Sequence, residues 1–346
     1  MNVHSSWLTV NRACNLSCKW CYAKNESKYN QMNYELAKKL IDICVDNGVG
    51  NFILIGGEPT IYPHFFDIID YLFFKSVSVT VVTNGIVLAQ DDFCKLMRNY
   101  NNKKKIHFGI SLKGADDETY LNDCGYAAFN DVIQGIRNCD FFGLNYSLSY
   151  VISNENVNQI DLFCKKIRQT GIEKPIFFVY CNDVIGSVNL NPLPEIDTDY
   201  KLAQKYDEIS RILDDKLKLH QSFPLCMCDK NMYEKMREKR QLITTCHVYN
   251  RKGIIFDTDG SILLCNHLAG YGLGKFGIDF TDSKSLDKFW NSEYILDLYK
   301  KFTSVPDEKC ISCDKYSECG GGCNIQWFTQ HFSKYKEYVK KKEDIL

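Results

Sequence analysis

The first two thirds of the chain alternate between short apolar runs and longer amphipathic stretches. The apolar runs are rich in β-branched and aromatic residues, and several are apolar throughout, as expected of strands that are buried on both faces of a parallel sheet. They predict strands at Trp7–Arg12, Asn51–Gly56, Ser78–Thr83, Ile106–Ser111, Asn145–Ile152 and Ile176–Cys181. Helical spacing of apolar residues between and after these strands predicts helices near Asn33–Asp46, Phe65–Phe74, Asp91–Asn99, Asn130–Cys139, Asn158–Thr170 and Tyr200–Leu217.

Six alternating strand–helix units predict an α/β fold with a parallel sheet. Six units are too few for a closed eight-fold barrel, so we expect a partial (β/α)6 TIM-like barrel over residues 1–217, with its site where the strands end. The polar segment Gly186–Asp199, which contains Pro192 and Pro194, reads as a connector. From residue 222 to 330 short strands, frequent turns and many cysteines predict a small α+β domain. Residues 331–346 predict a C-terminal helical tail.

Composition narrows the possible functions. The chain has 346 residues of which 45% are hydrophobic, and its 42 basic residues balance 43 acidic ones, so no broad surface for nucleic acid is expected. No apolar run approaches the roughly 20 residues that span a bilayer, and no secretory signal precedes the first strand. The cysteine count of 17 is odd, which argues against a disulfide framework and favours reduced thiols in a cytoplasmic protein.

Three cysteines follow the first predicted strand directly, in the run Cys14-Asn-Leu-Ser-Cys18-Lys-Trp-Cys21. Three thiolates from one loop can bind three irons of a 4Fe-4S cluster and leave the fourth iron open, whereas a zinc site usually has four ligands. This spacing resembles the signature of the radical SAM superfamily. The resemblance implies that the open iron binds S-adenosyl-L-methionine (SAM), which is cleaved to a 5′-deoxyadenosyl radical. Trp20 occupies the aromatic position before the last cysteine of that signature.

The ends of later strands extend the resemblance. The run Gly56-Gly57-Glu58-Pro59 matches the motif that holds the SAM amino group in this family, and its glycines permit close backbone approach. Thr83 and Asn84 end the third predicted strand at a position where relatives bind SAM.

The fourth and fifth predicted strands offer further SAM contacts. Ser111 is the candidate contact for the ribose or carboxylate, and Ile152 is a candidate apolar shelf for adenine or an ordinary core residue. Two positions depart from relatives: Lys113 stands where many have aspartate, and Asp123 stands where sulfatase-maturing relatives have arginine.

A second group of cysteines lies in the last third of the chain. Its register is Cys246, Gly260 and Cys265, followed by Cys310-x2-Cys313-x5-Cys319-x3-Cys323. Structural zinc is one explanation, because four of these thiolates could form a zinc site. The register also resembles the SPASM extension of radical SAM enzymes, which houses two auxiliary 4Fe-4S clusters.

The SPASM resemblance implies a division of these ligands. Cys246, Cys265 and Cys323 would serve the first auxiliary cluster, together with an upstream cysteine for which Cys226 and Cys228 are candidates. Cys310, Cys313 and Cys319 would serve the second cluster. The usual last ligand of that cluster follows Cys323, and this chain has no cysteine there. His331, an oxygen ligand, water or substrate is expected to fill that place, or the second cluster is labile.

The other cysteines carry less information. Cys44, Cys94, Cys139 and Cys164 lie in apolar helical patterns and are expected to be small buried hydrophobes. Cys124 has no assignment. Cys181, which ends the sixth predicted strand, is a candidate hydrogen-atom donor to a substrate radical.

The resemblance implies a peptide-modifying maturase of the oxidoreductase type. Hydrogen abstraction would be followed by oxidative C–S or C–C cross-linking of a ribosomally made precursor peptide, with auxiliary clusters accepting electrons. Formylglycine formation is less favoured, because the position of its aspartate base holds Asn266, followed by His267. Expected partners are the precursor peptide and an electron donor such as flavodoxin or ferredoxin. Because the chain begins directly at the first strand, leader recognition is expected to need a separate leader-binding protein or the C-terminal tail, or the enzyme acts without a leader.

Other functions are also consistent with these motifs. Peptide epimerisation or dehydrogenation would use the same cofactors. A radical SAM enzyme that acts on a sugar or tetrapyrrole would share the architecture. A non-catalytic zinc or electron-transfer protein is the alternative of a different class.

Overall fold

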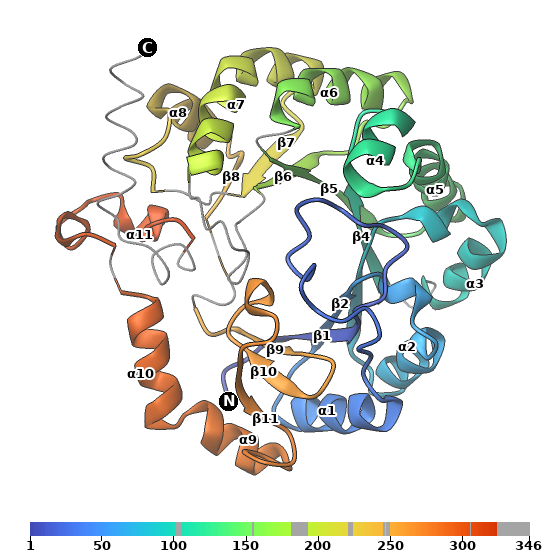
Figure 1. The fold of residues 1–346 in the computed structure, drawn as a ribbon, viewed down its shortest axis with the longest axis vertical. Helices are drawn as coiled ribbons and strands as arrows, with labels where there is room; N and C mark the ends of the chain where they lie inside the picture. The colour runs from blue at the N-terminus through green and yellow to red at the C-terminus, as the bar shows by residue number, and fades with distance from the viewer. Residues whose placement is uncertain are drawn as a thin grey trace. The chain divides into compact units, whose positions relative to one another are not determined.

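The computed structural model describes residues 1–101, 106–153, 156–180, 193–220, 224–244, 246, 250–304 and 306–323. It comprises two compact units (Figure 1). The first contains Met1–Leu148 and Asn250–Asp297, and the second contains Ser149–Tyr249 and Leu298–Leu346. The division between a barrel and a SPASM domain near residues 217–222 stays a prediction.

A predominantly parallel sheet forms the centre of the first unit, with the strand order β11-β10-β9-β1-β2-β3-β4. Parallel pairing joins β9, β1, β2, β3 and β4, whereas β10 and β11 complete an antiparallel edge. The bounds are β1 Ser5–Asn11, β2 Asn51–Gly56, β3 Ser78–Thr83, β4 Ile106–Leu112, β9 Gly253–Phe256, β10 Ser261–Leu263 and β11 Gly272–Lys275. The parallel contact of β9 with β1 brings the late part of the chain beside the first strand.

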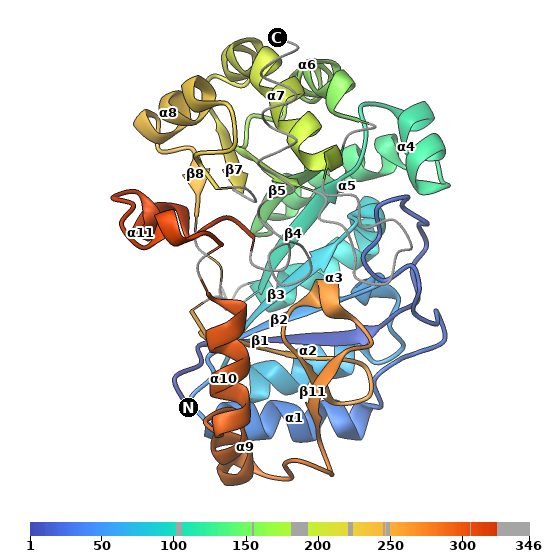
Figure 2. The same ribbon diagram turned by 60° about the vertical axis from the view of Figure 1, so that its left-hand side comes forward.

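Helices cover the strands of the first unit (Figures 1 and 2). Their bounds are α1 Tyr34–Asp46, α2 Phe65–Phe74, α3 Asp91–Asn101, α4 Asp117–Cys124, α5 Phe129–Phe142 and α9 Ser283–Trp290, with the 3-10 turns η1 Pro59–Ile61, η2 Ile86–Ala89 and η4 Asn266–Leu268. Helix α1 begins after Asn33, whose side chain accepts from two backbone N–H groups, as an N-cap should. Helix α9 packs on α1, and Asn47 Nδ2 donates to the Ser283 carbonyl at 3.0 Å.

The second unit has the parallel strand order β6-β7-β8. Its elements are η3 Val157–Gln159, α6 Ile160–Gln169, β6 Ile176–Tyr180, α7 Leu193–Ile212, β7 Leu217–His220, α8 Lys230–Glu238, β8 Leu242–Ile243, η5 Glu308–Cys310 and α11 Tyr316–Cys319. Strand β5 (Tyr146–Ile152) and helix α10 (Glu293–Phe302) each run across the boundary between the units.

The predicted α/β class with a parallel sheet is confirmed, and β2, β3 and α2 have the predicted bounds. The helix predicted at Tyr200–Leu217 is wrong at both ends. It begins at Leu193 because Pro194 lies in its first turn, where a missing N–H breaks no helical hydrogen bond. It ends at Ile212 because Asp214 and Asp215 have φ of 49° and 59°.

The predicted connector and helix α4 also differ from what the pattern predicts. The predicted connector Gly186–Asp199 is wrong at its end, because helix α7 already begins at Leu193. Its residues 186–192 lie outside the described residues. Helix α4 lacks a clear apolar stripe, and only a capping box between Asp116 and Thr119 marks its start. The predicted tail at 331–346 lies outside the described residues.

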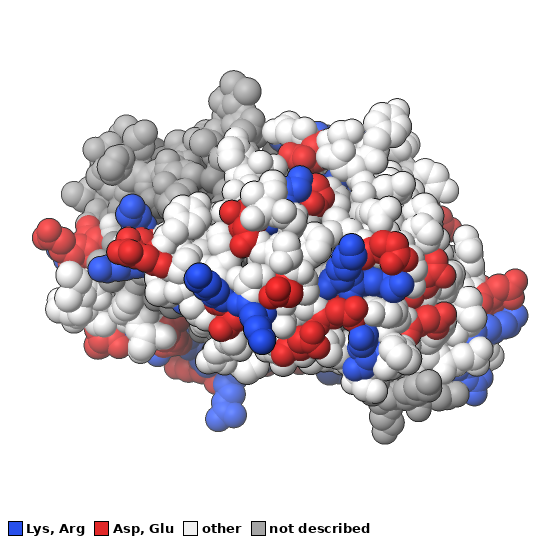
Figure 3. Space-filling model, turned by 90° about the horizontal axis from the view of Figure 1, so that it is seen from below, with Lys and Arg blue, Asp and Glu red and all other residues white. Residues whose placement is uncertain are grey.

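Charge is mixed on the face shown in Figure 3, where acidic and basic side chains are interspersed. This agrees with the balanced composition of the chain. Within the described ranges, every helix is too short or too polar to cross a bilayer.

Candidate functional site

The loop between β1 and α1 carries Cys14, Cys18 and Cys21, which are all partly buried. Backbone hydrogen bonds close the loop at its base: Arg12 N–H donates to the Asn30 carbonyl, and Met32 N–H donates to the Val10 carbonyl, each at 2.8 Å. Within the loop, Cys21 N–H donates to the Cys18 carbonyl at 3.1 Å. The three thiols are therefore presented on one tied segment that directly follows the first strand.

The three thiols lie close enough to interact electrostatically. Burial raises the pKa of Cys14 to about 11, and the negative charges of Glu58, Cys18 and Cys21 add to this effect. For Cys18, a hydrogen bond from Cys124 lowers the pKa to about 6, with a further contribution from Lys113. A thiolate is the form that binds metal, so the lowered pKa of Cys18 favours metal binding more than the raised pKa of Cys14 does.

The chemistry of the loop suits an iron–sulfur cluster. Three thiolates from one loop can each bind a different iron of a 4Fe-4S cluster, and the fourth iron keeps an open position. Among the described residues, no three or more His, Cys, Asp or Glu side chains are arranged around one metal ion.

Helix α4 holds the middle of the cysteine loop. Ser17 N–H donates to the Cys124 carbonyl at 2.8 Å, and Lys19 N–H donates to the Asp123 carbonyl at 3.0 Å. The Lys19 ammonium also pairs with the Asp123 carboxylate at 3.0 Å. Asp123 therefore positions the loop, and Cys124, which the sequence leaves without an assignment, contacts Cys18.

The Gly56–Pro59 run lies directly against the start of the cysteine loop. Gly57 N–H donates to the Asn11 carbonyl at 2.9 Å, and Glu58 N–H donates to the Ala13 carbonyl at 2.8 Å. A Cβ atom on Gly57 would lie 2.1 Å from the Ala13 carbonyl oxygen. Only glycine permits this approach, which joins the end of β2 to the residue before Cys14.

The Glu58 carboxylate joins the ends of β2 and β3. One oxygen accepts from the Thr60 N–H at 3.1 Å and from the Thr60 and Thr83 hydroxyls at 2.8 Å, and the other accepts from the Asn84 N–H at 2.7 Å. Its exposure is only 1%, and burial raises its pKa although these donors oppose the rise. In this structure Glu58 therefore positions the ends of these two strands.

Other predicted SAM contacts have definite local partners. Asn84 Nδ2 donates to Asn15 Oδ1 in the cysteine loop at 2.6 Å. Ser111 is largely buried, and its hydroxyl accepts from the Lys113 ammonium at 2.6 Å. Trp20 is partly buried. Ile152 is fully buried on β5, and its proposed contact with adenine stays a prediction.

Sequence reasoning missed Tyr22 and the residues around it. The Tyr22 hydroxyl donates to the Gly56 carbonyl at 3.4 Å, and its ring lies 5.7 Å from the ring of His267. His267 Nδ1 is 3.5 Å from Cys265 Sγ. Cys265 of the second cysteine group therefore lies beside the end of the first cysteine loop, a long-range contact that spacing does not reveal.

A buried ion pair, also missed, links the loop to the β9–β10 hairpin. Arg12 Nη2 lies 2.5 Å from Asp257 Oδ1, and the two side chains are 2% and 9% exposed. The only sequence signal was a pair of charged residues at strand ends, which does not distinguish a buried pair from a solvated one.

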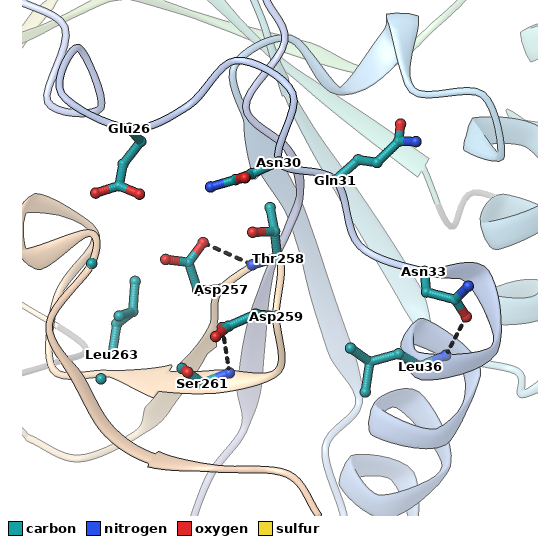
Figure 4. A pocket seen from close by; sticks show the side chains of 12 residues that line it. Glu26, Asn30, Gln31, Asn33, Leu36, Asp257, Thr258, Asp259, Ser261 and Leu263 are labelled. Carbon is teal, nitrogen blue, oxygen red and sulfur yellow. Dashed lines mark hydrogen bonds between the residues drawn. The ribbon is translucent and has the colours of Figure 1, made fainter.

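A polar pocket of about 420 Å³ adjoins this ion pair (Figure 4). Its lining includes the carboxylates of Glu26, Asp257 and Asp259 and the side chains of Asn30 and Thr258. Asp257 is paired with Arg12, and Asp259 is paired with Lys275 at 2.7 Å. Glu26 makes no ion pair with any described residue, so the pocket suits a cationic or hydrogen-bond-donating group. None of the predicted SAM contacts lines it.

The other cysteines follow two patterns. Cys44, Cys94, Cys139 and Cys164 are fully buried, as predicted for packing residues. Cys265, Cys310, Cys319 and Cys323 are partly buried, Cys226, Cys246 and Cys313 are exposed, and Cys228 is buried. None of the described cysteines forms a disulfide. Cys181 and His331 lie outside the described residues.

Comparison with known proteins places this geometry in context. Residues 8–167 match the family model of the Radical SAM superfamily. The subtilosin biosynthesis protein AlbA of Bacillus subtilis is 28% identical over 173 residues, which are 49% of this chain and 38% of AlbA. The Fe-coproporphyrin III synthase of Methanosarcina barkeri is 26% identical over 62% of this chain and 52% of that protein. The chain thus spans about half or less of these relatives.

A solved structure resembles nearly the whole chain. SuiB of Streptococcus suis, bound to its precursor peptide SuiA, aligns with a TM-score of 0.71 over 95% of this chain and 74% of SuiB, at 16% identity. At this identity the likeness concerns the fold. It extends from the parallel strands into the late, cysteine-rich part of the chain.

Proposed function

We propose that this protein, which contains a radical SAM domain over residues 8–167, is a peptide-modifying maturase. The observation that carries the proposal is the attachment of Gly56–Glu58 to the start of the Cys14, Cys18 and Cys21 loop. That attachment unites the two motifs that a radical SAM enzyme needs for one cofactor site. When bound, the cluster and SAM supply a 5′-deoxyadenosyl radical that removes a hydrogen atom from substrate.

The residues of the chain have separate tasks in this proposal. Cys14, Cys18 and Cys21 hold the cluster, and the backbone of Gly56 and Gly57 contacts SAM. Glu58 fixes the strand ends through its four hydrogen bonds. Helix α4 keeps Cys18 in place through the backbone carbonyls of its last two residues.

A precursor peptide is the proposed substrate. AlbA is a bacteriocin biosynthesis protein, and SuiB was solved with a precursor peptide bound. Similarity to these two proteins supports a peptide substrate. The proposed reaction is oxidative C–S or C–C cross-linking. One hydrogen atom leaves to the 5′-deoxyadenosyl radical, and one proton and one electron leave as the new bond forms. An auxiliary cluster held by the late cysteines would accept that electron, and a flavodoxin or ferredoxin would supply the electron that starts turnover.

SAM cleavage tests the first part of the proposal. Anaerobically reconstituted protein with dithionite and SAM should release 5′-deoxyadenosine and methionine. Replacing Cys14, Cys18 and Cys21 by alanine should abolish the release, whereas Cys164→Ala, in a fully buried packing position, should retain it. Absence of 5′-deoxyadenosine from the cluster-loaded natural protein would overturn the proposal.

Co-expression with a short peptide gene found beside this one tests the substrate. Cross-linking or dehydrogenation should lower the peptide mass by two hydrogens, and tandem mass spectrometry locates the bond. An unchanged mass with altered retention identifies epimerisation instead. An unmodified peptide together with active SAM cleavage would remove the peptide assignment.

A tetrapyrrole is the second candidate substrate, because the similarity to the Fe-coproporphyrin III synthase covers 62% of this chain. Incubation of the loaded enzyme with an iron porphyrin that carries propionate groups distinguishes the two. Loss of carboxyl groups would support this candidate, and an unchanged porphyrin would dismiss it.

A further inference from the structure

The set Cys310, Cys313 and Cys319 needs a fourth ligand if it holds a 4Fe-4S cluster, and the sequence contains no cysteine after Cys323. We propose that Cys226 supplies this ligand from the opposite direction in the chain. The inference depends on the proposed function in one respect, namely that the bound group is an iron–sulfur cluster. All four residues belong to the second compact unit.

Short turns hold the three late cysteines on one continuous segment. Cys313 N–H donates to the Cys310 carbonyl at 3.3 Å, and Tyr316 N–H donates to the Cys313 carbonyl at 3.1 Å. Cys319 N–H donates to the Lys315 carbonyl at 2.8 Å, in the last turn of α11. The three thiols lie close enough for the charges of Cys319 and Cys313 to act on the Cys310 thiol.

The segment that carries Cys226 docks on these turns. Leu225 N–H donates to Cys319 Sγ at 3.3 Å, so the residue next to Cys226 already contacts a sulfur of the set. Met227 N–H donates to the Pro224 carbonyl at 2.9 Å and closes a turn around Cys226. A second link follows in α8, where Arg237 Nε pairs with Glu318 Oε1 at 2.7 Å.

Cys226 and Cys228 have opposite environments. Cys226 is exposed, and the charges of Cys319, Cys310 and Cys313 all act on its thiol. Cys228 is 7% exposed and lies against Tyr233 and the buried carboxylate of Asp199. The backbone contact at Leu225 places the exposed Cys226 next to Cys319, whereas Cys228 is packed in the interior. This difference in position and burial favours Cys226 over Cys228.

The assignment changes the expected chemistry of the second auxiliary site. The set Cys226, Cys310, Cys313 and Cys319 becomes a closed four-thiolate site, which suits electron transfer or structural support.

Matched variants test the assignment in the full chain. Cys226→Ala and Cys228→Ala are each made in a background that lacks Cys14, Cys18 and Cys21, so that only auxiliary clusters contribute. After anaerobic reconstitution, iron per chain and the electron paramagnetic resonance (EPR) spectrum of the dithionite-reduced protein are measured. Cys226→Ala should lose about four irons per chain, or retain a cluster whose spectrum changes when a small thiol is added. Cys228→Ala should keep the parent iron content and spectrum.

Three outcomes would overturn the inference. A Cys226→Ala protein with the iron content and spectrum of its parent would reject it, as would equal iron loss in both variants. Zinc in place of iron in the parent would reject the cluster. None of these results affects SAM cleavage by the natural protein, so the failure of this inference and the failure of the proposed function are distinguishable.

Discussion

Arg12 and Asp257 form a buried ion pair across 245 positions of sequence, with 2.5 Å between Nη2 and Oδ1. Arg12 stands two residues before Cys14, and Asp257 follows β9. Asp257 Oδ1 also accepts from the Thr258 N–H at 2.7 Å. The pair therefore fixes the β9–β10 hairpin to the base of the cysteine loop.

We expect Asp257→Asn to lower the free energy of unfolding by about 3–5 kcal/mol, because it leaves the Arg12 charge buried without its partner. Urea unfolding of the cluster-loaded protein measures the loss. Glu35→Gln is the matched control, since Glu35 and Lys38 form an exposed pair worth less than about 1 kcal/mol. Equal effects of the two variants would contradict a structural role for the buried pair.

Gly57→Ala should disturb the cofactor site. Its Cβ would lie 2.1 Å from the Ala13 carbonyl oxygen, a backbone atom that cannot rotate away. We expect about 1–3 kcal/mol of destabilisation and a lower iron content at the first cluster, measured by unfolding and metal analysis. Gly50→Ala is the control, because a Cβ there meets nothing within 4 Å. Iron loading that is the same in both variants would disprove the steric argument.

Glu58→Gln tests whether the carboxylate positions the strand ends. The amide nitrogen must face either the Thr60 N–H or the Asn84 N–H, and neither can accept a hydrogen bond. We expect a loss of about 1–3 kcal/mol, read from urea unfolding, and weaker SAM binding by equilibrium dialysis. Glu173→Gln, at an exposed residue that pairs with Lys216, should have little effect. A free energy of unfolding in the Glu58→Gln variant equal to that of the natural protein would refute this role.

Asp199 predicts a pH dependence of stability. Burial raises its pKa from 3.8 to about 6, although Tyr180 and the Asp229 N–H donate to the carboxylate. Between these two values the folded protein binds more protons than the unfolded chain, so stability falls as the pH rises. From pH 5 to 7 the loss should be about 1 kcal/mol.

Chemical unfolding at several pH values measures this slope. The Asp199→Asn variant carries no titrating group at this position. Subtracting its free energy of unfolding from that of the natural protein removes any effect of cluster loss that the two share. If this difference in free energy is constant from pH 5 to 7, the assignment to Asp199 is wrong.

Most of the parallel strands and the cysteine motif could be predicted because they depend on local pattern. Strand β2 reads as a continuous apolar run, and Cys14, Cys18 and Cys21 are defined by spacing within eight residues. Helix α4 and the start of α7 escaped prediction for local reasons too. One lacks an apolar stripe, and the other begins among prolines that its first turn tolerates.

The sequence by itself determined the fold class, the radical SAM motif and the burial of Cys44, Cys94, Cys139 and Cys164, because each is encoded in residues near one another in the chain. The tertiary structure alone decided that Glu58 binds the strand ends, that Arg12 pairs with Asp257, and that Cys226 and Cys228 face different surroundings. These relationships join residues from separate elements. The direction of a side chain and its burial depend on how those elements pack, which spacing along the chain does not specify.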